Sequence, residues 1–447
     1  MDYTPHTEAD IEAMLGVIGV KRIEDLFHDV PEAHRFPALD LPDGLSQQEV
    51  MRELEALSSR NVPGARQPIF LGAGAYNHYS PPVVNYVIQR GEFLTAYTPY
   101  QPEVSQGTLQ AIFEYQSMIC ALTGMEVANA SHYDGATSLA EAAIMALNAH
   151  RGKRTRMVIC SGVHPEYRRV VHTYTQGMGV EIVGDTACYV DVDRLIALID
   201  ENTAMVAVQY PDFFGQVHDV KRVIDAAQAK GALSCIVADP IALGMLKPPG
   251  QFGADIVVAE GQSLGIPISF GGPYLGIFAT REKHVRKMAG RLVGETVDAQ
   301  GRRGYVLTLA TREQHIRRER ATSNICTNQG LIALAAAVYL SLMGKQGLRK
   351  VAELCYHKSH YAAREIDKLD GFRVDWSRPF IKEFVVECPR PVAEINAYLL
   401  EQHGIIGGYD LHKDYVDRPN QMLIAVTEMN TKEQIDRLVA ALGEVAS

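Results

Sequence analysis

Residues 253–263 read GADIVVAEGQS, and this stretch decides how the middle of the chain folds. Ile256–Ala259 is apolar at every position, which is typical of a strand buried on both faces of a mainly parallel sheet. A second apolar run, Tyr274–Ala279, follows a turn that contains Gly271-Gly272. Upstream, similar runs alternate with amphipathic helices at Met157–Ser161, Ala204–Tyr210 and Ala232–Ala238. The alternation predicts a doubly wound α/β layer structure.

The two ends of the chain have different patterns. Near the amino terminus, apolar residues recur at helical spacing from Ile11 to Ile18. After Thr327, helical patterns (Leu331–Met343, Leu348–Lys368, Val392–Gln402, Lys432–Leu442) alternate with short strand patterns (Gly371–Asp375, Ile381–Glu387, Gln421–Val426). We therefore predict an N-terminal helical arm over residues 1–65, a large domain with a mainly parallel sheet over 66–327, and a smaller α+β C-terminal domain over 328–447.

Composition excludes several classes of function. The chain has 447 residues, 47% of them hydrophobic, and a net charge of -10, which argues against nucleic acid or an anionic membrane as a partner. We find no secretory signal and no apolar run long enough to span a membrane. Seven scattered cysteines suggest reduced thiols and a cytoplasmic location. Histidines and carboxylates do not cluster at metal-ligand spacing, so no metal is predicted.

Residues 133–138, YDGATS, precede a predicted helix. Gly135 permits close backbone approach, and the hydroxyls of Thr137 and Ser138 lie near the expected helix N-terminus. Such a corner can hold a phosphate group. The alternative is helix capping by Asp134 or Ser138 beside a turn glycine, and for this stretch alone capping is favoured.

Asp239 directly follows the buried run Ala232–Ala238. A carboxylate at the end of such a strand can pair with the ring nitrogen of pyridoxal phosphate and keep it protonated. Asp239 followed by Pro240 is also a good N-cap with proline at the first helical position. The two interpretations are compatible.

The order of these features resembles the pyridoxal-phosphate-dependent transferase-like enzymes of fold type I. In that fold, the resemblance implies a Schiff-base lysine shortly after the strand that begins near Asp255. Here Gln262 and Ser263 occupy the expected position, and no lysine lies between Lys247 and Lys283. The resemblance also makes His164 a candidate for stacking on the cofactor ring, although most lone histidines are structural.

Two polar segments have the content of recognition surfaces. Residues 97–107, YTPYQPEVSQG, combine aromatic, acidic and amide side chains on a proline-rich loop, with candidates Tyr97, Tyr100, Glu103, Ser105 and Gln106. The alternative is a capped helix entry with Ser105 at the N-cap and tyrosines in the core.

Residues 311–327, TREQHIRRERATSNICT, contain arginines dense enough to bind a carboxylate or phosphate. The candidates are Arg312, Arg317, Arg318, Ser323 and Asn324. A solvated helix face with Glu313 and Glu319 as i,i+4 partners would explain part of this pattern.

The chain is similar over essentially its whole length to the P-protein family of the glycine cleavage system. The stretches that carry the similarity are 97–107, 133–138, Gly271-Gly272-Pro273 and, above all, 311–327. The resemblance is to subunit 1 of the form in which this enzyme is split into two subunits.

The resemblance implies a division of labour. The family decarboxylates glycine on pyridoxal phosphate and passes the aminomethyl group to the lipoyl arm of the H-protein. Subunit 2 is expected to carry the lysine and the cofactor, in a heterodimer that could pair again. We expect 97–107 and 311–327 to form part of the wall of the partner's site. Gly135, Thr137, Ser138, His164 and Asp239 would then be vestigial.

Two alternatives remain open. The chain could be a self-sufficient pyridoxal-phosphate enzyme with its lysine elsewhere, for which Lys247, Lys283 and Lys287 are the nearest candidates. It could also be a purely structural or regulatory partner subunit.

Overall fold

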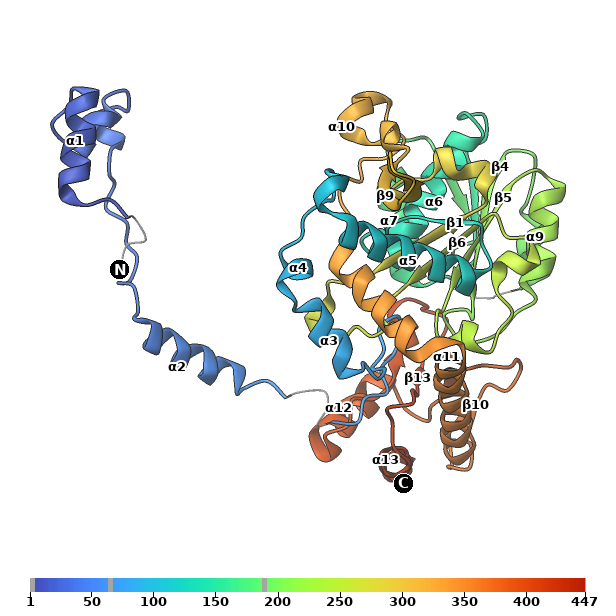
Figure 1. The fold of residues 1–447 in the computed structure, drawn as a ribbon. Coiled ribbons are helices and arrows are strands. Elements are labelled where there is room, and N and C mark those ends of the chain that lie inside the picture. The colour runs from blue at the N-terminus through green and yellow to red at the C-terminus, as the bar shows by residue number, and fades with distance from the viewer. Residues whose placement is uncertain (1–4, 63–66, 187–190, 447) are drawn as a thin grey trace. The chain divides into compact units, whose positions relative to one another are not determined.

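A computed structural model describes residues 5–62, 67–186 and 191–446 (Figure 1). The chain divides into two units, residues 1–62 and 63–447. The first unit contains two α-helices, α1 (Glu8–Ile18) and α2 (Gln47–Ser58). Each begins with a capping box, Thr7 with Asp10 and Ser46 with Glu49, so the first turn of each helix is hydrogen-bonded by side chains. The helical pattern predicted from Ile11 to Ile18 is thus confirmed as α1.

The second unit is built on the predicted α/β sheet. In the described residues, the strand order is β1-β7-β6-β5-β4-β2-β3. Strands β3, β2, β4, β5 and β6 pair in parallel, and β7 is antiparallel to both of its neighbours. The bounds are β1 Val127–Ala128, β2 Arg156–Ile159, β3 Glu181–Val183, β4 Thr203–Tyr210, β5 Leu233–Ala238, β6 Ile256–Glu260 and β7 Gly276–Thr280.

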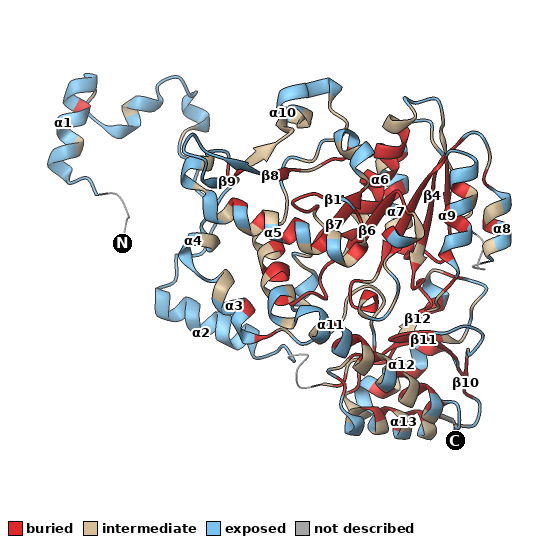
Figure 2. Ribbon diagram, turned by 45° about the vertical axis from the view of Figure 1, so that its right-hand side comes forward, coloured by how far each residue is buried: buried red, intermediate tan, exposed pale blue. Residues whose placement is uncertain are grey.

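The central strands β4, β5 and β6 are buried almost throughout, as their unbroken apolar pattern predicts (Figure 2). Helix α6 (Gly135–Ala149) packs across the sheet, and most of its residues are buried. The other helices around the sheet are α3 Pro82–Ile88, α4 Gly91–Leu94, α5 Gln106–Thr123, α7 Pro165–Thr175, α8 Val192–Ala197 and α9 Val220–Ala229. The doubly wound, fold type I architecture is therefore confirmed.

A smaller antiparallel sheet lies toward the carboxyl end, in the order β10-β11-β13-β12. Its strands are β10 Arg373–Val374, β11 Glu383–Glu387, β12 Tyr409–Asp410 and β13 Gln421–Ala425, and its helices are α12 Val392–His403 and α13 Lys432–Ala446. The predicted α+β elements after Thr327 are present, while β12 and a polar hairpin of β8 (Leu292–Val297) and β9 (Arg303–Thr308) were not predicted.

Helix α11 (Gly330–Ile366) leads into the smaller sheet. Gly344 interrupts it with a φ of 58°, close to the break that the sequence predicts between two helices. Among the described helices, α11 is the one long and apolar enough to cross a membrane. Ala335, Ala336 and Tyr339 are nevertheless buried in the main hydrophobic core, so α11 is a core helix.

Candidate functional site

A cavity lies at the carboxyl ends of β5 and β6, where ligands bind in open α/β sheets. Its volume is about 50 Å³. Several parts of the second unit line it, including the loop after β6, the start of α7 and the start of β11. The polar lining residues include Tyr76, His164, Tyr167, Asp239, Glu260, Gln262, Ser263, Lys382 and Glu383.

Gln262 is the first of the two residues at the position where a Schiff-base lysine was expected. Its side chain is fully buried and bonds three backbone groups. Gln262 Oε1 accepts from Tyr76 N at 3.0 Å, and Nε2 donates to Tyr76 O at 3.0 Å and to Ile266 O at 2.7 Å. The adjacent Ser263 is also buried. At this position the chain has a structural amide in place of an amine nucleophile.

Asp239 bonds the turn that follows β5, and its carboxylate pairs with Lys382 in the place of the cofactor ring nitrogen that its sequence context suggested. Its Oδ1 accepts from the backbone N–H groups of Ile241 at 3.0 Å and Ala242 at 3.3 Å, as an N-cap does. Its Oδ2 forms an ion pair with Lys382 Nζ at 2.6 Å. Burial acts to raise the pKa of Asp239, but the Lys382 charge and hydrogen bond outweigh it, so this pKa is lowered. The carboxylate is ionised, and a cation is already beside it.

Lys382 is a site residue that the sequence analysis missed. It is only 2% exposed, and Nζ lies 3.4 Å from the centroid of the Tyr76 ring. The sequence does contain a signal for Lys382, which is a lysine inside the predicted strand Ile381–Glu387. A lysine buried in such a strand needs a partner of opposite charge, so it points to a polar site nearby. Of the lysines considered earlier, Lys247 lies over the Phe252 ring and Lys283 pairs with Asp255; neither lines the cavity.

Hydrogen bonds within the chain engage the main donors of the proposed phosphate corner. Helix α6 begins at Gly135, four residues earlier than predicted, and Asp134 is its N-cap. Asp134 Oδ1 accepts from Thr137 N at 2.7 Å, and Ser138 Oγ donates to Asp134 O at 2.8 Å. Gly135 N donates to Glu260 Oε2 at 3.0 Å. The N–H groups of Gly135 and Thr137 and the Ser138 hydroxyl are therefore already used.

Glu260 is a second site residue that the sequence analysis did not single out. Besides Gly135 N, its carboxylate accepts from Gln262 N and from Leu275 N, each at 2.9 Å. Burial raises the pKa of Glu260 to about 7 in spite of these bonds. Burial likewise raises the pKa of Glu383, another carboxylate of the cavity, to about 7.

His164 has a structural role in this pocket. Its Nδ1 accepts from Glu166 N at 3.2 Å, and Nε2 lies 2.9 Å from Ala73 O, so the ring caps α7 and ties down a loop. The ring stacks on Tyr167, with centroids 4.8 Å apart and planes 26° apart. Burial lowers the pKa of His164, which favours the neutral ring.

Pyridoxal phosphate does not fit this pocket. The pocket's free volume of about 50 Å³ is smaller than an engineered cavity of about 150 Å³ that binds benzene, and the ring of the cofactor with its substituents is larger than benzene. The Asp239 carboxylate, the Gly135 N–H and the space near His164 are all engaged by other groups of the chain.

The loop 97–107 is largely exposed, in contrast to the pocket. Tyr97 is 85% exposed and lines a hollow of about 220 Å³ together with residues of α4, α5 and the start of α11. Tyr100 accepts from Arg291 Nη2 at 3.3 Å through its hydroxyl. Glu103 is exposed, and Ser105 sits at the N-cap position of α5 without a capping side-chain bond. Gln106 binds the backbone of Tyr305 with its amide.

The segment 311–327 is not the solvated helix considered as its ordinary explanation. Only Gln314–Arg317 is α-helical, as α10, because Arg318 has a positive φ of 54° that breaks the helix. Arg312 donates to three backbone carbonyl groups, those of Met288, Gly290 and Leu309, and so holds the segment in place.

The other candidates of this segment differ in exposure. Arg317, Arg318 and Asn324 are exposed. Ser323 Oγ donates to the buried Glu141 at 2.7 Å. Arg291 donates to Cys326 O as well as to Tyr100, and the Tyr100 and His315 rings lie 6.2 Å apart. The structure therefore brings the two predicted segments side by side.

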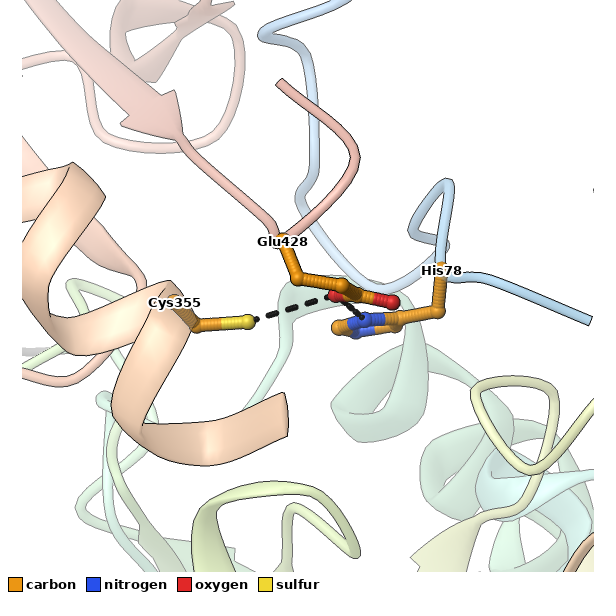
Figure 3. Close-up of side chains that lie close together, drawn as sticks. All are labelled: His78, Cys355 and Glu428. Atoms are coloured by element: carbon orange, nitrogen blue, oxygen red, sulfur yellow. Dashed lines mark hydrogen bonds and ion pairs between the residues drawn. The ribbon is translucent and has the colours of Figure 1, made fainter. Parts of the chain in front are cut away.

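A buried cluster of His78, Cys355 and Glu428 also escaped the sequence analysis (Figure 3). Glu428 Oε2 lies 2.7 Å from His78 Nδ1 and accepts from the Cys355 thiol at 3.5 Å. Two ligands of one tetrahedral zinc would be about 3.3 Å apart, so the 2.7 Å contact is a hydrogen bond. Burial acts to raise the pKa of Glu428, but His78 lowers it to about 2. This network joins α11 to two loops and does not favour a metal.

Comparisons with known proteins agree with the fold and show the family. The family model of the glycine cleavage system P-protein matches residues 1–442. A probable glycine dehydrogenase (decarboxylating) subunit 1 of Thermomicrobium roseum is 55% identical and covers 100% of both chains. Its counterpart in Brevibacillus brevis is 52% identical, over 99% of this chain and 98% of the relative.

Solved structures place the chain in the same group. A crystal structure of glycine decarboxylase (P-protein) of the glycine cleavage system, in inhibitor-bound form, matches with a TM-score of 0.91 and 44% identity over 100% of both chains. A glutamate decarboxylase of Lactobacillus brevis matches with a TM-score of 0.68 at 14% identity, over 92% of this chain and 95% of that one, which shows the fold alone. The chain belongs to the glycine cleavage system P-protein family.

Proposed function

We propose that this chain is the lysine-less subunit of a two-subunit glycine dehydrogenase (decarboxylating). A partner, subunit 2, would carry the Schiff-base lysine and pyridoxal phosphate. The observation that carries the proposal is Gln262-Ser263 in the lysine position of an otherwise intact fold type I sheet. The name "subunit 1" of the relatives supports a partner.

The reaction proposed for the complex is decarboxylation of glycine and transfer of its aminomethyl group to the lipoyl arm of the H-protein. The cofactor on the partner would supply the electron sink for the carbanion that decarboxylation leaves. This chain would help to bind and orient the glycine and the lipoyl arm, and it would shield the partner's site from water. We propose that the two subunits form a heterodimer, which can pair again into a dimer of heterodimers.

The groups of this chain that we assign to the facing wall are those of 97–107 and 311–327. Arg317 and Arg318 are exposed cations suited to a carboxylate. Tyr97 and neighbouring apolar side chains border the hollow of about 220 Å³, which suits an alkyl chain such as a lipoyl arm. The bonds of Arg291 to Tyr100 and Cys326 would keep the two segments in register.

A reconstitution experiment tests the proposal. Each subunit is purified alone, and exchange between the carboxyl group of glycine and bicarbonate is measured in the presence of lipoylated H-protein. We expect exchange only when the two are mixed. Exchange by this chain alone would favour a self-sufficient enzyme. Full exchange by the partner alone would favour a purely structural or regulatory subunit.

We also propose a cytoplasmic location for the complex. The free thiols of all six described cysteines support it, because disulfides are rare in reducing compartments.

A further inference from the structure

The small cavity contains a buried ion pair and, at another place, a buried carboxyl group held by backbone N–H groups. At one place the Lys382 ammonium faces the Asp239 carboxylate at 2.6 Å. At the other, the Glu260 carboxylate accepts from Gly135 N at the start of α6. Pyridoxal phosphate has the same two poles, a protonated ring nitrogen and a phosphate. We propose that Lys382 and Glu260 occupy the places of these poles, so that the chain keeps its vestigial cofactor site filled with its own side chains.

The cationic pole is held by a side chain that cannot easily leave. Lys382 is almost fully buried, and a buried ammonium group is costly unless it stays paired. Asp239 supplies the pairing charge, and the face of the Tyr76 ring lies against Nζ. A ring nitrogen could reach Asp239 only by displacing this ammonium group, which would then lose its ionic partner.

Lys382 is also in the wrong place to act as a substitute Schiff-base lysine. In pyridoxal phosphate the aldehyde carbon is para to the ring nitrogen. An amine beside Asp239 therefore lies at the nitrogen end of such a ring, opposite the carbon that it would have to attack. The position of Lys382 therefore supports the interpretation that its side chain fills the site, and not that it replaces the catalytic lysine.

The anionic pole is held by Glu260. A carboxylate at a helix N-terminus is stabilised by the free N–H groups and the helix dipole, as a phosphate is. Glu260 uses Gly135 N there, together with Gln262 N and Leu275 N. A phosphate would have to compete for the same Gly135 donor and would lie beside a like charge.

The ion pair between Lys382 and Asp239 also joins the two sheets of the second unit. Lys382 immediately precedes β11 of the smaller sheet, whereas Asp239 follows β5 of the larger one. The proposal deepens the proposed function, because it explains why this half of the enzyme does not compete for the cofactor. The proposal rests on the proposed function only because it takes this chain to be the subunit without the Schiff-base lysine.

The first test uses the unaltered full-length chain. It is titrated by equilibrium dialysis with 4′-deoxypyridoxine 5′-phosphate, which keeps both poles but lacks the aldehyde and cannot react with surface lysines. We expect no saturable binding up to about 1 mM. Saturable binding in the micromolar range would overturn the proposal.

The second test removes the two internal charges with Lys382→Met and Glu260→Gln. The double variant is expected to bind the same probe at least about tenfold more tightly than the unaltered chain. Lys432→Met with Glu433→Gln, on the surface of α13, is the matched control and should not bind. If circular dichroism shows that the double variant is unfolded, each single variant is titrated instead, and each should still exceed the control. A folded variant that binds no better than the control contradicts the proposal.

The third test restores a lysine with Ser263→Lys and adds pyridoxal phosphate itself. After borohydride reduction, peptide mass mapping should find a pyridoxyl group at position 263 only when Lys382→Met and Glu260→Gln are also present. Modification of position 263 with Ser263→Lys alone would overturn the proposal. The partner subunit takes part in none of these tests. The proposal about the filled site can therefore fail while the reconstitution experiment succeeds, and the reconstitution experiment can fail while these tests succeed.

Discussion

The cavity beside β5 and β6 and the exposed pair of segments, 97–107 and 311–327, differ in how their polar groups are used. In the cavity, the side chains of Gln262, Asp239 and Glu260 bind other groups of the chain. In the segments, exposed side chains project from irregular backbone that includes a positive φ at Arg318. Strained, exposed loops are where function is usually found. The contrast teaches that a fold can keep the frame of a cofactor site while its recognition chemistry lies on another surface.

The largest effect should come from breaking the buried ion pair of the cavity. Lys382→Ala leaves the Asp239 carboxylate buried without its cation, which should lower the free energy of unfolding by about 3–5 kcal/mol. Urea unfolding followed by circular dichroism measures this. Lys432→Ala, which removes an exposed lysine of α13 and its surface ion pair, should cost much less. Equal losses in the two variants would mean that the cavity is not held by its internal charges.

The pH dependence of stability should reflect the buried carboxyl groups. Glu383 has a pKa of about 7 when folded, above the value of 4.5 for a free side chain, so the folded state binds more protons between these values. Its contribution is therefore complete below pH 4.5 and lost as the pH rises through 7, by up to about 3 kcal/mol. Glu383→Gln should reduce the slope of the unfolding free energy against pH between about pH 5 and 7.5, while Glu260 keeps a slope of the same sign. An unchanged slope would contradict the assignment.

Truncating the side chain in the lysine position should have an intermediate effect. Gln262→Ala leaves three buried backbone groups without their partner. We expect a loss of about 2–3 kcal/mol in unfolding free energy, because each unpaired buried group costs about 1–3 kcal/mol and the loop can partly relax. Gln89→Ala, at an exposed glutamine, is the control. A loss no greater than that of the control would show that Gln262 is not structural.

The smallest effect should appear in catalysis alone. Arg318→Ala in the two-subunit enzyme should reduce glycine–bicarbonate exchange by about tenfold, or about 1.4 kcal/mol, with little change in stability. Arg349→Ala, on exposed α11 surface, should leave exchange unchanged. If both variants retain full exchange, the 311–327 segment does not contribute Arg318 to the partner's site.

Apolar runs were sufficient to predict the central strands of the large sheet, because a strand buried on both faces rarely carries polar side chains, but they did not indicate the edge strands β1 and β3. Strands β4, β5 and β6 were therefore placed to within a residue or two. The β8–β9 hairpin escaped prediction because its strands carry polar and charged residues, and its turn depends on Gly301 with a φ of 77°.

The site was predictable where its signal is local in the sequence. The missing lysine at Gln262-Ser263 and the carboxylate at Asp239 follow from spacing along consecutive strands. Lys382 and Glu260 were missed as site residues because their partners, Asp239 and Gly135, are distant in sequence and meet them only in the folded chain. The extended path of 311–327 likewise depends on Arg312 bonding a distant backbone segment.

The central claim is that the cofactor of the complete enzyme is bound to the partner and not to this chain. Borohydride reduction of the active two-subunit enzyme, followed by peptide mass mapping of both chains, tests this directly. We predict a pyridoxyl-lysine on the partner and none on this chain. A pyridoxyl group on any lysine of this chain, and above all on Lys382 in the cavity, would contradict the account.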